Sequence, residues 1–337
     1  MHEALLQSPD AGKAVRCAMC AHRCTIPDGR RGICAVRENR GGTLYSLVWG
    51  KPCAANPDPI EKKPLYHFLP GSKAYSIATP GCNFRCKNCQ NWEISQMTRD
   101  GGEIVGEEVE PKEIVEGAKA TGCSSIAYTY TEPTIFMEYA LDVSKLAAKD
   151  GLRNVFVSNG YMTDDSVGLI APYLHADNVD LKSFSDRFYR ENCGGSLEPV
   201  LSTLKDLMRR GVWVEVTTLI IPTLNDGQEE LGQIAGFIAS ELGDHVPWHV
   251  SAFHPDYKLG GIPATGVNAV EKAVKLGRDA GLKYVYAGNV PHGRFEDTCC
   301  PGCGELLIER HGFSIVRNRM AEGACPGCRR PAEGVWS

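Results

Sequence analysis

Residues 79–92 read TPGCNFRCKNCQNW, and they give the strongest signal in the sequence. It directly follows Ala74–Thr79, a short β-rich run, and it places three cysteines in the spacing C-x3-C-x2-C, at Cys82, Cys86 and Cys89. Three thiolates in this spacing can bind three irons of a [4Fe–4S] cluster, whereas a cluster that only transfers electrons normally has four. One iron then stays open, as a catalytic metal site requires. We predict a cluster whose open iron binds the amino and carboxylate groups of a small molecule.

A zinc knuckle made of the same three cysteines and a histidine is the structural alternative. Residues 79–92 contain no histidine, and the nearest one upstream is His67. The sequence therefore favours the cluster over zinc at this site.

On the C-terminal side of this stretch, β-rich and helical runs alternate as far as residue 287. The predicted strands are Ala74–Thr79, Ser125–Tyr130, Asn154–Ser158, Asn178–Lys182, Val212–Ile221, His249–Phe253 and Lys283–Ala287. The predicted helices are Pro111–Ala120, Thr134–Lys149, Asp164–Leu174, Leu197–Arg210, Gln228–Leu242 and Val267–Ala280. This alternation predicts an α/β fold, and it favours a closed or partial (β/α) barrel over an open doubly wound sheet. No Gly-x-Gly-x-x-Gly follows the first strand, which argues against a dinucleotide-binding domain.

The composition is that of an ordinary globular protein apart from its cysteines. The 337 residues are 43% hydrophobic and 23% charged, which excludes a disordered chain. No apolar run reaches the roughly 18 residues of a membrane span, and the net charge of −5 argues against a general nucleic-acid binder. The N-terminus has no secretory signal, so we expect a cytoplasmic protein. Its 15 cysteines are an odd number, and in a reducing compartment their clustering indicates metal or redox chemistry.

The last cluster of cysteines forms two C-P-G-C knuckles around a predicted hairpin at Glu305–Arg319. Its four thiols are Cys300, Cys303, Cys325 and Cys328. Two such knuckles make a tetrahedral site of four thiolates, typical of a structural zinc ribbon. A rubredoxin-like iron is the alternative, and Cys299 is expected to take no part.

The first cluster of cysteines follows the spacing C-x2-C-x3-C-x9-C, at Cys17, Cys20, Cys24 and Cys34. Four thiolates leave no open metal position, so the site is predicted to hold zinc or an auxiliary iron–sulfur cluster, with zinc slightly favoured. His22 is an alternative ligand. Because a short segment buries little core, the metal would contribute directly to its folding.

The clusters divide the chain into three parts. We predict a Cys-rich metal-binding segment over residues 1–70, a partial barrel over 71–295 and a zinc-ribbon-like module over 296–337. Three further thiols, Cys53, Cys123 and Cys193, are expected to be ordinary side chains.

The cysteine motif and two further runs carry a resemblance to a known superfamily. C-x3-C-x2-C after the first strand of a βα barrel resembles the radical S-adenosylmethionine (SAM) signature. Over roughly residues 50–295 the chain is similar to the activating enzymes of pyruvate formate-lyase and other glycyl radical enzymes. The runs DPIEKKPLYHFLPG, at 58–71, and CQNWEIS, at 89–95, resemble the radical SAM member of the AmmeMemoRadiSam system. Asn88 departs from the aromatic residue usual before the third cysteine, and this affects how the adenine is held.

The resemblance implies a specific reaction. The reduced [4Fe–4S] cluster donates an electron to the sulfonium of SAM, which gives methionine and a 5′-deoxyadenosyl radical that abstracts hydrogen from the substrate. The cofactor carries this chemistry, and the protein positions it and excludes water. The sequence identifies no catalytic residue that contacts the substrate.

The resemblance also assigns residues at strand ends, where active sites of βα barrels gather. Glu132 ends a motif that is Gly-Gly-Glu-Pro in the family, and is implied to contact the SAM amino group; a helix N-cap is the alternative. Ser158 and Asn159 resemble part of the family's Thr-Asn-Gly and are candidates for the methionine carboxylate or the ribose, or form a turn. Asp180 and Lys182, which share one strand face, are candidates for the ribose or amino group and for the carboxylate; a buried ion pair is the alternative.

Three further residues are weaker candidates. His254 aligns with a histidine near SAM in the activating enzymes, although a lone histidine is more often structural. Glu215 falls where those enzymes tend to carry arginine, on a strand expected to face the pocket, and this puts the substrate in doubt. His292 is a candidate for the pocket rim.

The resemblance suggests partners but no substrate. A Memo-type and an Ammecr-type protein are the family's usual partners, and a low-potential donor such as flavodoxin or ferredoxin is expected to supply the electron. A glycyl radical enzyme activase is the second reading. A non-catalytic zinc-stabilised interaction scaffold is the third. Fold alone does not set the function.

Overall fold

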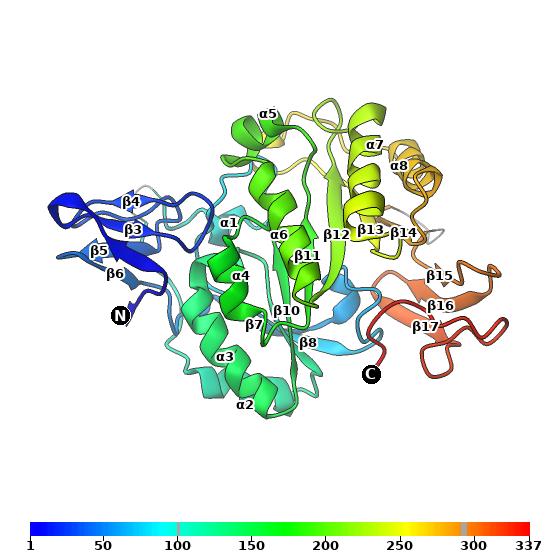
Figure 1. Ribbon diagram of the computed structural model, residues 1–337, viewed down its shortest axis with the longest axis horizontal. Helices are drawn as coiled ribbons and strands as arrows, with labels where there is room; N and C mark the ends of the chain where they lie inside the picture. The colour runs from blue at the N-terminus through cyan, green and yellow to red at the C-terminus, as the bar shows by residue number, and fades with distance from the viewer. Residues whose placement is uncertain (100–101, 291–294) are drawn as a thin grey trace.

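A single large sheet organises the structure, a computed structural model that describes residues 1–99, 102–290 and 295–337 (Figure 1). Its parallel strands lie side by side in chain order: β8 (Lys73–Ala78), β9 (Ser125–Tyr128), β10 (Arg153–Ser158), β11 (Ala176–Asp180), β12 (Trp213–Ile220), β13 (Trp248–Ala252) and β14 (Val285–Gly288). A further strand, β7 (Ala54–Pro59), pairs antiparallel with β8. Within the described residues β7 and β14 remain the two edges, so the barrel is partial, as predicted.

Helices connect the parallel strands and pack along the sheet (Figure 1). They are α1 (Trp92–Ser95), α2 (Pro111–Ala120), α3 (Met137–Lys149), α4 (Asp164–Ile170), α5 (Asp186–Phe188), α6 (Glu198–Arg209), α7 (Gln228–Phe237) and α8 (Val267–Asp279). Every predicted strand and helix therefore has a counterpart. Because each crossover joins neighbouring parallel strands, the carboxyl ends of the strands gather at one end of the sheet.

Local sequence signals explain where the helices begin and end. Thr163 accepts a hydrogen bond from the Ser166 N–H and caps α4. Gly151 follows α3 with a φ of 79°, a conformation that favours glycine. The predicted helix Asp164–Leu174 is too long, because α4 ends at Ile170. Pro172 lacks the N–H that would continue the helix.

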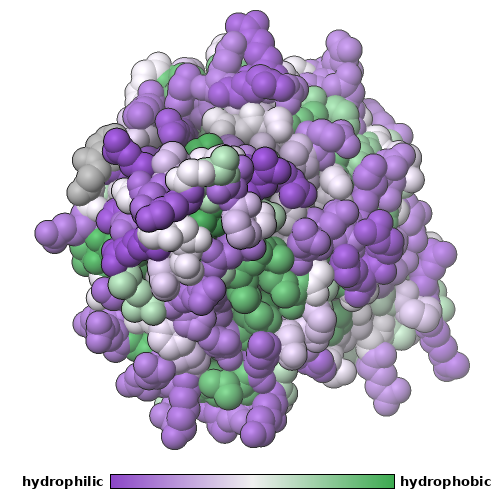
Figure 2. Space-filling model, turned by 60° about the vertical axis from the view of Figure 1, so that its left-hand side comes forward, coloured by the Kyte–Doolittle hydropathy of each residue, from purple (hydrophilic) through white to green (hydrophobic). Residues whose placement is uncertain are grey.

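Two small antiparallel sheets form the N-terminal part. One contains β1 (His2–Glu3), β6 (Thr43–Ser46) and β5 (Arg37–Arg40), and the other contains β2 (Gln7–Pro9), β3 (Val15–Cys17) and β4 (Thr25–Ile26). Figure 2 brings this side of the molecule forward and shows a mostly hydrophilic surface with apolar residues in a few small areas. The Val15, Ile26 and Leu44 side chains are buried in the main core, so these sheets pack directly on the barrel.

A third small sheet forms the C-terminal part, at the opposite side of the view in Figure 1. It contains β15 (Thr298–Cys299), β16 (Leu306–His311) and β17 (Ser314–Asn318), and the last two form the predicted hairpin. The chain then returns to the barrel, where the Val335 N–H donates to the His67 carbonyl at 2.7 Å. None of the helices in the described residues is long and apolar enough to cross a membrane.

Candidate active site

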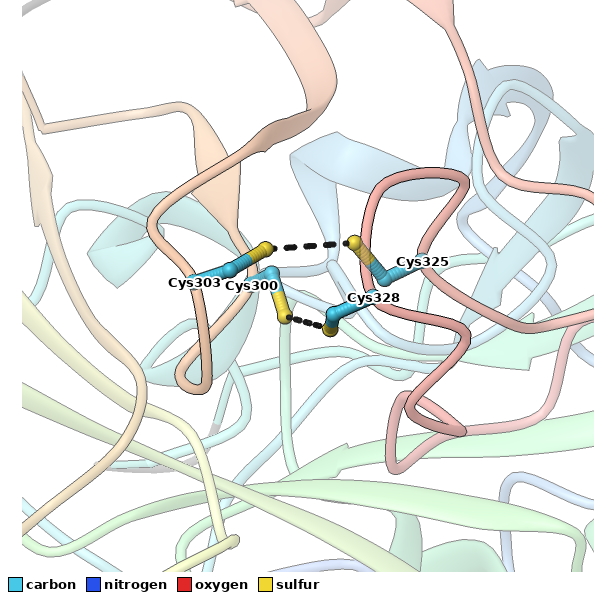
Figure 3. Close-up of side chains that lie close together, drawn as sticks. All are labelled: Cys300, Cys303, Cys325 and Cys328. Atoms are coloured by element: carbon cyan, nitrogen blue, oxygen red, sulfur yellow. Dashed lines mark hydrogen bonds between the residues drawn. The ribbon is translucent and has the colours of Figure 1, made fainter.

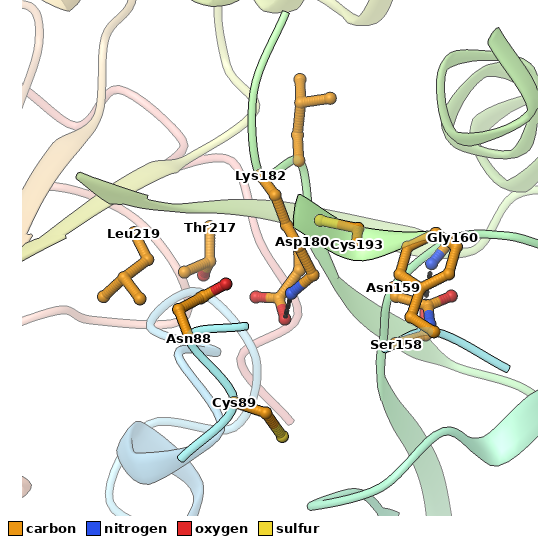
Figure 4. A network of polar contacts seen from close by, with 12 residues as sticks. Asn88, Cys89, Ser158, Asn159, Gly160, Asp180, Lys182, Cys193, Thr217 and Leu219 are labelled. Atoms are coloured by element: carbon orange, nitrogen blue, oxygen red, sulfur yellow. Dashed lines mark hydrogen bonds and ion pairs between the residues drawn. The ribbon is translucent and has the colours of Figure 1, made fainter. Parts of the chain in front are cut away.

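A polar cavity opens at the carboxyl ends of the parallel strands. The empty space among its side chains is about 1220 Å³, including the part open to solvent. Strand-end residues from β9 to β14 line it: Thr129, Tyr130, Thr131, Glu132, Val157, Ser158, Asn159, Asp180, Lys182, Thr217, Leu219, Ser251 and Asn289. Figure 4 shows Asn88 and Cys89 on the loop after β8, with Asp180, Lys182 and Thr217 from the neighbouring strands around them. This is the end of the barrel where active sites form.

Cys82, Cys86 and Cys89 all line this cavity. Their loop is anchored on the segment after α5, because the Arg85 N–H donates to the Cys193 carbonyl at 2.7 Å. Gly81 makes the close approach possible: its φ is 101°, and a Cβ there would lie 2.6 Å from Val36 Cγ1. These contacts with the protein fix the path of the loop beside β8.

The three thiols differ in their surroundings. Burial raises the pKa of Cys82 and of Cys89. The neighbouring Cys193 thiol lowers the pKa of Cys86. Cys193 is thus not remote from the site, although burial raises its own pKa far above the usual value. A metal that binds Cys82 and Cys89 would displace their protons.

The alternative of a zinc knuckle completed by His67 does not fit. His67 Nε2 lies 2.6 Å from the Tyr286 hydroxyl, and its Nδ1 lies 2.7 Å from the Glu333 carbonyl. Its ring is held at the contact between the barrel and the C-terminal tail, and it is absent from the cysteine-lined cavity. Three thiols and no histidine suit a cluster with one open iron.

Glu132 lines the cavity and also caps the turn after β9. Its Oε1 accepts hydrogen bonds from the Thr134 N–H at 3.1 Å and hydroxyl at 2.6 Å, and its Oε2 accepts one from the Asn159 N–H at 2.8 Å. Burial raises the pKa of this carboxyl to about 7. Glu132 therefore forms the helix N-cap that was the alternative role, and its side chain also lines the cavity.

Ser158 and Asn159 reach the same cavity, with their side chains engaged in protein contacts. Ser158 Oγ donates to Asp177 Oδ2 at 3.1 Å. Asn159 Nδ2 donates to Asn83 Oδ1 at 2.7 Å, and its Oδ1 accepts from the Tyr161 N–H at 3.0 Å. Asn159 therefore forms the expected turn and ties the end of β10 to the cysteine loop.

Asp180 and Lys182 form the ion pair expected from their spacing. Lys182 Nζ lies 2.7 Å from Asp180 Oδ2, and the two side chains are 17% and 36% exposed, for Lys182 and Asp180 respectively. Although burial opposes its charge, Asp180 and the Cys86 thiol hold the pKa of Lys182 well above the usual value. The pair lies beside the cysteine loop, where a permanent cation can bind a carboxylate.

The structure places two other candidates elsewhere. His254 is exposed and absent from the cavity lining, and it lies two residues beyond the end of β13 (Trp248–Ala252). Glu215 is buried and also absent from the lining; it accepts hydrogen bonds from the N–H groups of Tyr66 and His67 at 3.0 and 2.8 Å. The strand that carries Glu215 does reach the cavity, as expected, but through Thr217 and Leu219, and Glu215 itself does not line it. His292 lies outside the described residues.

One wall of the cavity was not anticipated from the sequence. Asp58 forms ion pairs with Lys62 and Lys63 at 2.8 and 2.9 Å, and both lysines line the cavity. Burial lowers the pKa of Lys63 to about 8. The Tyr130 hydroxyl donates a hydrogen bond to Asp58. The backbone of Tyr130 has a φ of 64°, a left-handed conformation that glycine adopts more easily than tyrosine. The run at 58–71 contained this signal, because its paired lysines follow an aspartate.

The four C-terminal cysteines converge as the ribbon predicts (Figure 3). All four Sγ atoms lie within 4.8 Å of one another. Cys300 Sγ is 3.5 Å from Cys328 Sγ, and Cys303 Sγ is 3.6 Å from Cys325 Sγ. Tetrahedral bonds of about 2.3 Å to one ion would separate the sulfurs by about 3.8 Å. The geometry fits a single metal ion.

The four N-terminal cysteines line a second, smaller cavity, together with Arg37 and Ile135. His22, the alternative ligand, instead approaches the Asn83 carbonyl at 2.9 Å through its Nε2. Two other thiols lie apart from both cavities: Cys53 donates to the Ala78 carbonyl, and Cys123 is buried in the core.

Comparisons with known proteins agree with the fold and the cysteine loop. The model of the radical SAM superfamily matches residues 76–238. An uncharacterized protein of Methanocaldococcus jannaschii is 46% identical over 330 residues, which cover 97% of this chain and 98% of that protein. The pyruvate formate-lyase-activating enzyme of Clostridium pasteurianum is 26% identical over 198 residues, or 55% and 81% of the two chains.

A solved structure shares the fold. SuiB of Streptococcus suis bound to S-adenosylmethionine has a TM-score of 0.51 at 13% identity, and the match covers 69% of this chain and 53% of SuiB. The superfamily implies a [4Fe–4S] cluster and SAM, which excludes the reading as a non-catalytic scaffold. With its signature thiols gathered at the strand ends of a partial barrel, the chain belongs to the radical SAM superfamily and is an enzyme of that type.

Proposed function

We propose that Cys82, Cys86 and Cys89 hold the [4Fe–4S] cluster and that the enzyme cleaves SAM there. When bound and reduced, this cluster supplies one electron to the SAM sulfonium and releases methionine and a 5′-deoxyadenosyl radical, which takes a hydrogen atom from the substrate. The observation that carries the proposal is the cavity itself, where three thiols stand beside a buried acid and an ion pair. The residues around it bind SAM and keep water from the radical.

The cavity offers a charge pattern that matches the two ends of an amino acid. Lys182 supplies the cation for the methionine carboxylate, and Asp180 accepts from the ribose or the amino group. Glu132 is the carboxylate for the SAM ammonium, and a bound ammonium would lower its raised pKa. Ser158 and Asn159 contribute by shaping the end of β10, since their side chains already have protein partners.

Anaerobic reconstitution with iron and sulfide tests this proposal. We expect about four irons at the loop and formation of 5′-deoxyadenosine with SAM and dithionite. The Cys86→Ala variant should lose the product, while Cys123→Ala, a buried cysteine away from the cavity, serves as the matched control. A wild-type protein that binds this iron but forms no 5′-deoxyadenosine, or a Cys86→Ala variant that still forms it, contradicts the assignment.

We further propose a cytoplasmic role of the AmmeMemoRadiSam type, supported by the sequence run at 58–71. That run contributes Lys62 and Lys63 to the cavity, so the feature that resembles this family reaches the proposed site of reaction. The substrate is then a Memo-type or Ammecr-type protein, or a small molecule that they hold, and flavodoxin or ferredoxin supplies the electron. Deuterium transfer from a labelled partner into 5′-deoxyadenosine identifies the substrate.

Activation of a glycyl radical enzyme is the second candidate. Its support is the similarity to the pyruvate formate-lyase-activating enzyme of Clostridium pasteurianum. In that case the hydrogen comes from a backbone glycine, and a partner deuterated at its glycine α-carbon transfers the label and acquires a stable radical signal. Transfer from any other labelled position favours the first candidate.

Zinc is proposed for the C-terminal cysteines, because the short sulfur separations fit one tetrahedral ion. Backbone N–H groups of Gly302 and Cys303 overcome burial and lower the pKa of Cys300 to about 7, which favours the thiolate that binds metal. Metal analysis before reconstitution distinguishes zinc from a rubredoxin-like iron, whose visible charge-transfer bands zinc lacks. The variant for this measurement is Cys82→Ala/Cys86→Ala/Cys89→Ala with Cys20→Ala added, so that the N-terminal cysteines do not contribute a metal of their own.

A further inference from the structure

The N-terminal cysteines share a cavity but do not close around a single ion. Cys17 lies in β3, Cys20 and Cys24 lie in the loop before β4, and Cys34 precedes β5; all four line the same small cavity. Among the described residues, the C-terminal four are the only group of three or more potential ligands whose atoms lie within 4.8 Å of one another. The N-terminal thiols are thus gathered, yet spaced more widely than the ribbon thiols.

The sulfur–sulfur distances at the two other cysteine sites can be compared with those of the N-terminal cysteines. The ribbon sulfurs approach to 3.5 and 3.6 Å, as bonds to one ion require. Cys82, Cys86 and Cys89 line one cavity, but their sulfurs do not all lie within 4.8 Å of one another either. The superfamily implies an iron–sulfur cluster at these three cysteines. A cluster bonds each thiolate to a different iron, so it holds its ligands farther apart than one ion does. In this respect the N-terminal cysteines resemble the cluster site.

Arg37 provides a second, independent observation. Its side chain lines the same cavity and is 2% exposed. Nη2 binds both carboxylate oxygens of Glu138, at 2.9 and 2.6 Å, whereas no partner for Nε or Nη1 is present among the described residues. Buried guanidinium donors without partners are costly. An anionic metal group bound by the four thiolates in this cavity would accept hydrogen bonds from Nε and Nη1 of Arg37.

The charge of Arg37 indicates that an anion is bound, whereas the distances between the sulfurs bear on which metal group it is. Zinc with four thiolates and an oxidised [4Fe–4S] cluster with four thiolates both carry a net negative charge, so Arg37 indicates only that an anion is bound. The spacing distinguishes the two. We propose that Cys17, Cys20, Cys24 and Cys34 hold an auxiliary iron–sulfur cluster and not zinc, which reverses the preference drawn from the sequence.

The site lies next to the catalytic loop. Arg99 joins the two, because its Nη1 donates to the Ile33 carbonyl at 2.9 Å and its Nη2 to the Cys82 carbonyl at 2.8 Å. The Gly81 backbone packs on the Cys34 and Val36 segment. A redox-active group at the N-terminal site would therefore be one loop away from the catalytic thiols, whereas zinc there would have no redox role.

The triple variant Cys82→Ala/Cys86→Ala/Cys89→Ala isolates the N-terminal site in the full chain. After anaerobic reconstitution we expect about four irons and four sulfides to remain per chain, with a reduced-cluster signal in electron paramagnetic resonance after dithionite. About one metal ion should remain at the ribbon. Adding Cys20→Ala to the triple variant should remove the cluster signal, while the unchanged ribbon metal and circular dichroism verify folding.

The opposite results overturn the inference. A triple variant with no cluster and a second zinc that disappears with Cys20→Ala shows a zinc site, and a variant with neither metal shows no site. The single Cys20→Ala variant separates this inference from the proposed function. It should keep the iron of the catalytic loop, whether or not SAM is cleaved, so a failure at one site does not imply failure at the other.

Discussion

Glu215 Oε2 lies 2.6 Å from His249 Nε2, in a fully buried contact between β12 and β13. Glu215 also accepts from the Trp213 indole at 3.1 Å and from the two N–H groups that hold Tyr66 and His67. Thr217, two residues further along β12, lines the cavity. Glu215 therefore lies two residues before the cavity lining on β12 and anchors the run at 58–71.

Loss of this anchor should destabilise the protein more than it affects SAM cleavage. Glu215→Ala leaves four donors without an acceptor, and three of these contacts are buried. We therefore expect the free energy of unfolding, measured by denaturant titration, to fall by roughly 3–5 kcal/mol. Glu215→Gln, which keeps one acceptor, should lose about half as much. A Glu215→Ala variant that is as stable as the wild type but has altered substrate selectivity would show that Glu215 contacts the substrate and does not anchor the fold.

His67 should make the stability depend on pH. Burial lowers the pKa of His67 from 6.5 to about 4, so the unfolded chain binds a proton in this window while the folded chain does not. Stability therefore falls as the pH drops from about 6.5 to 4, by up to roughly 3 kcal/mol. The difference in unfolding free energy between wild type and His67→Gln, measured across this range, isolates the contribution. A constant difference would show that His67 does not titrate as expected.

Lys182 should contribute to SAM affinity. Removing a charged partner of a carboxylate typically costs about 1.5–3 kcal/mol, so Lys182→Met should weaken SAM binding about 10–100-fold in the reconstituted enzyme. Lys275→Met, an exposed position on α8, is the matched control and should bind normally. Unchanged affinity in Lys182→Met, measured by equilibrium dialysis, would exclude the proposed contact.

The left-handed backbone conformation at Tyr130 should lower the stability of the protein when any residue other than glycine occupies this position. With a φ of 64°, an alanine there keeps the strain that a glycine relieves, and both variants lose the contact with Asp58. Tyr130→Gly should therefore be more stable than Tyr130→Ala by about 1 kcal/mol. Denaturant titration of the pair measures the difference, and the reverse order would show that the loop changes conformation.

Removal of the ribbon metal should loosen the C-terminal tail. Glu333 of this tail binds Lys283 at 2.8 Å and the Tyr284 hydroxyl at 2.7 Å, and the proposed metal would close the segment that precedes it. Cys325→Ser should lose the metal and lower hydrogen-exchange protection at residues 66–69 and 333–336. Protection equal to that of the Cys299→Ser control would mean that the tail docks without the metal.

Short-range patterns in the sequence determined the superfamily, the strands and the helices. Cysteine spacing within one loop or knuckle is limited by the reach of the chain, so residues 79–92 and the two C-P-G-C knuckles predict their sites directly. Periodicity likewise predicts β9 and α2, because burial on one face requires it.

Only the tertiary structure decided which distant groups meet. The contact of Glu215 with Tyr66 and His67 joins residues about 150 positions apart, and the wall formed by Lys62 and Lys63 depends on where β7 pairs with β8. The N-terminal sulfurs come together from separate segments of the chain, beside Arg37. Strand register and packing set these distances, and no local pattern encodes them. The sequence alone predicts the three cysteines proposed to hold the cluster, whereas packing sets which side chains surround them.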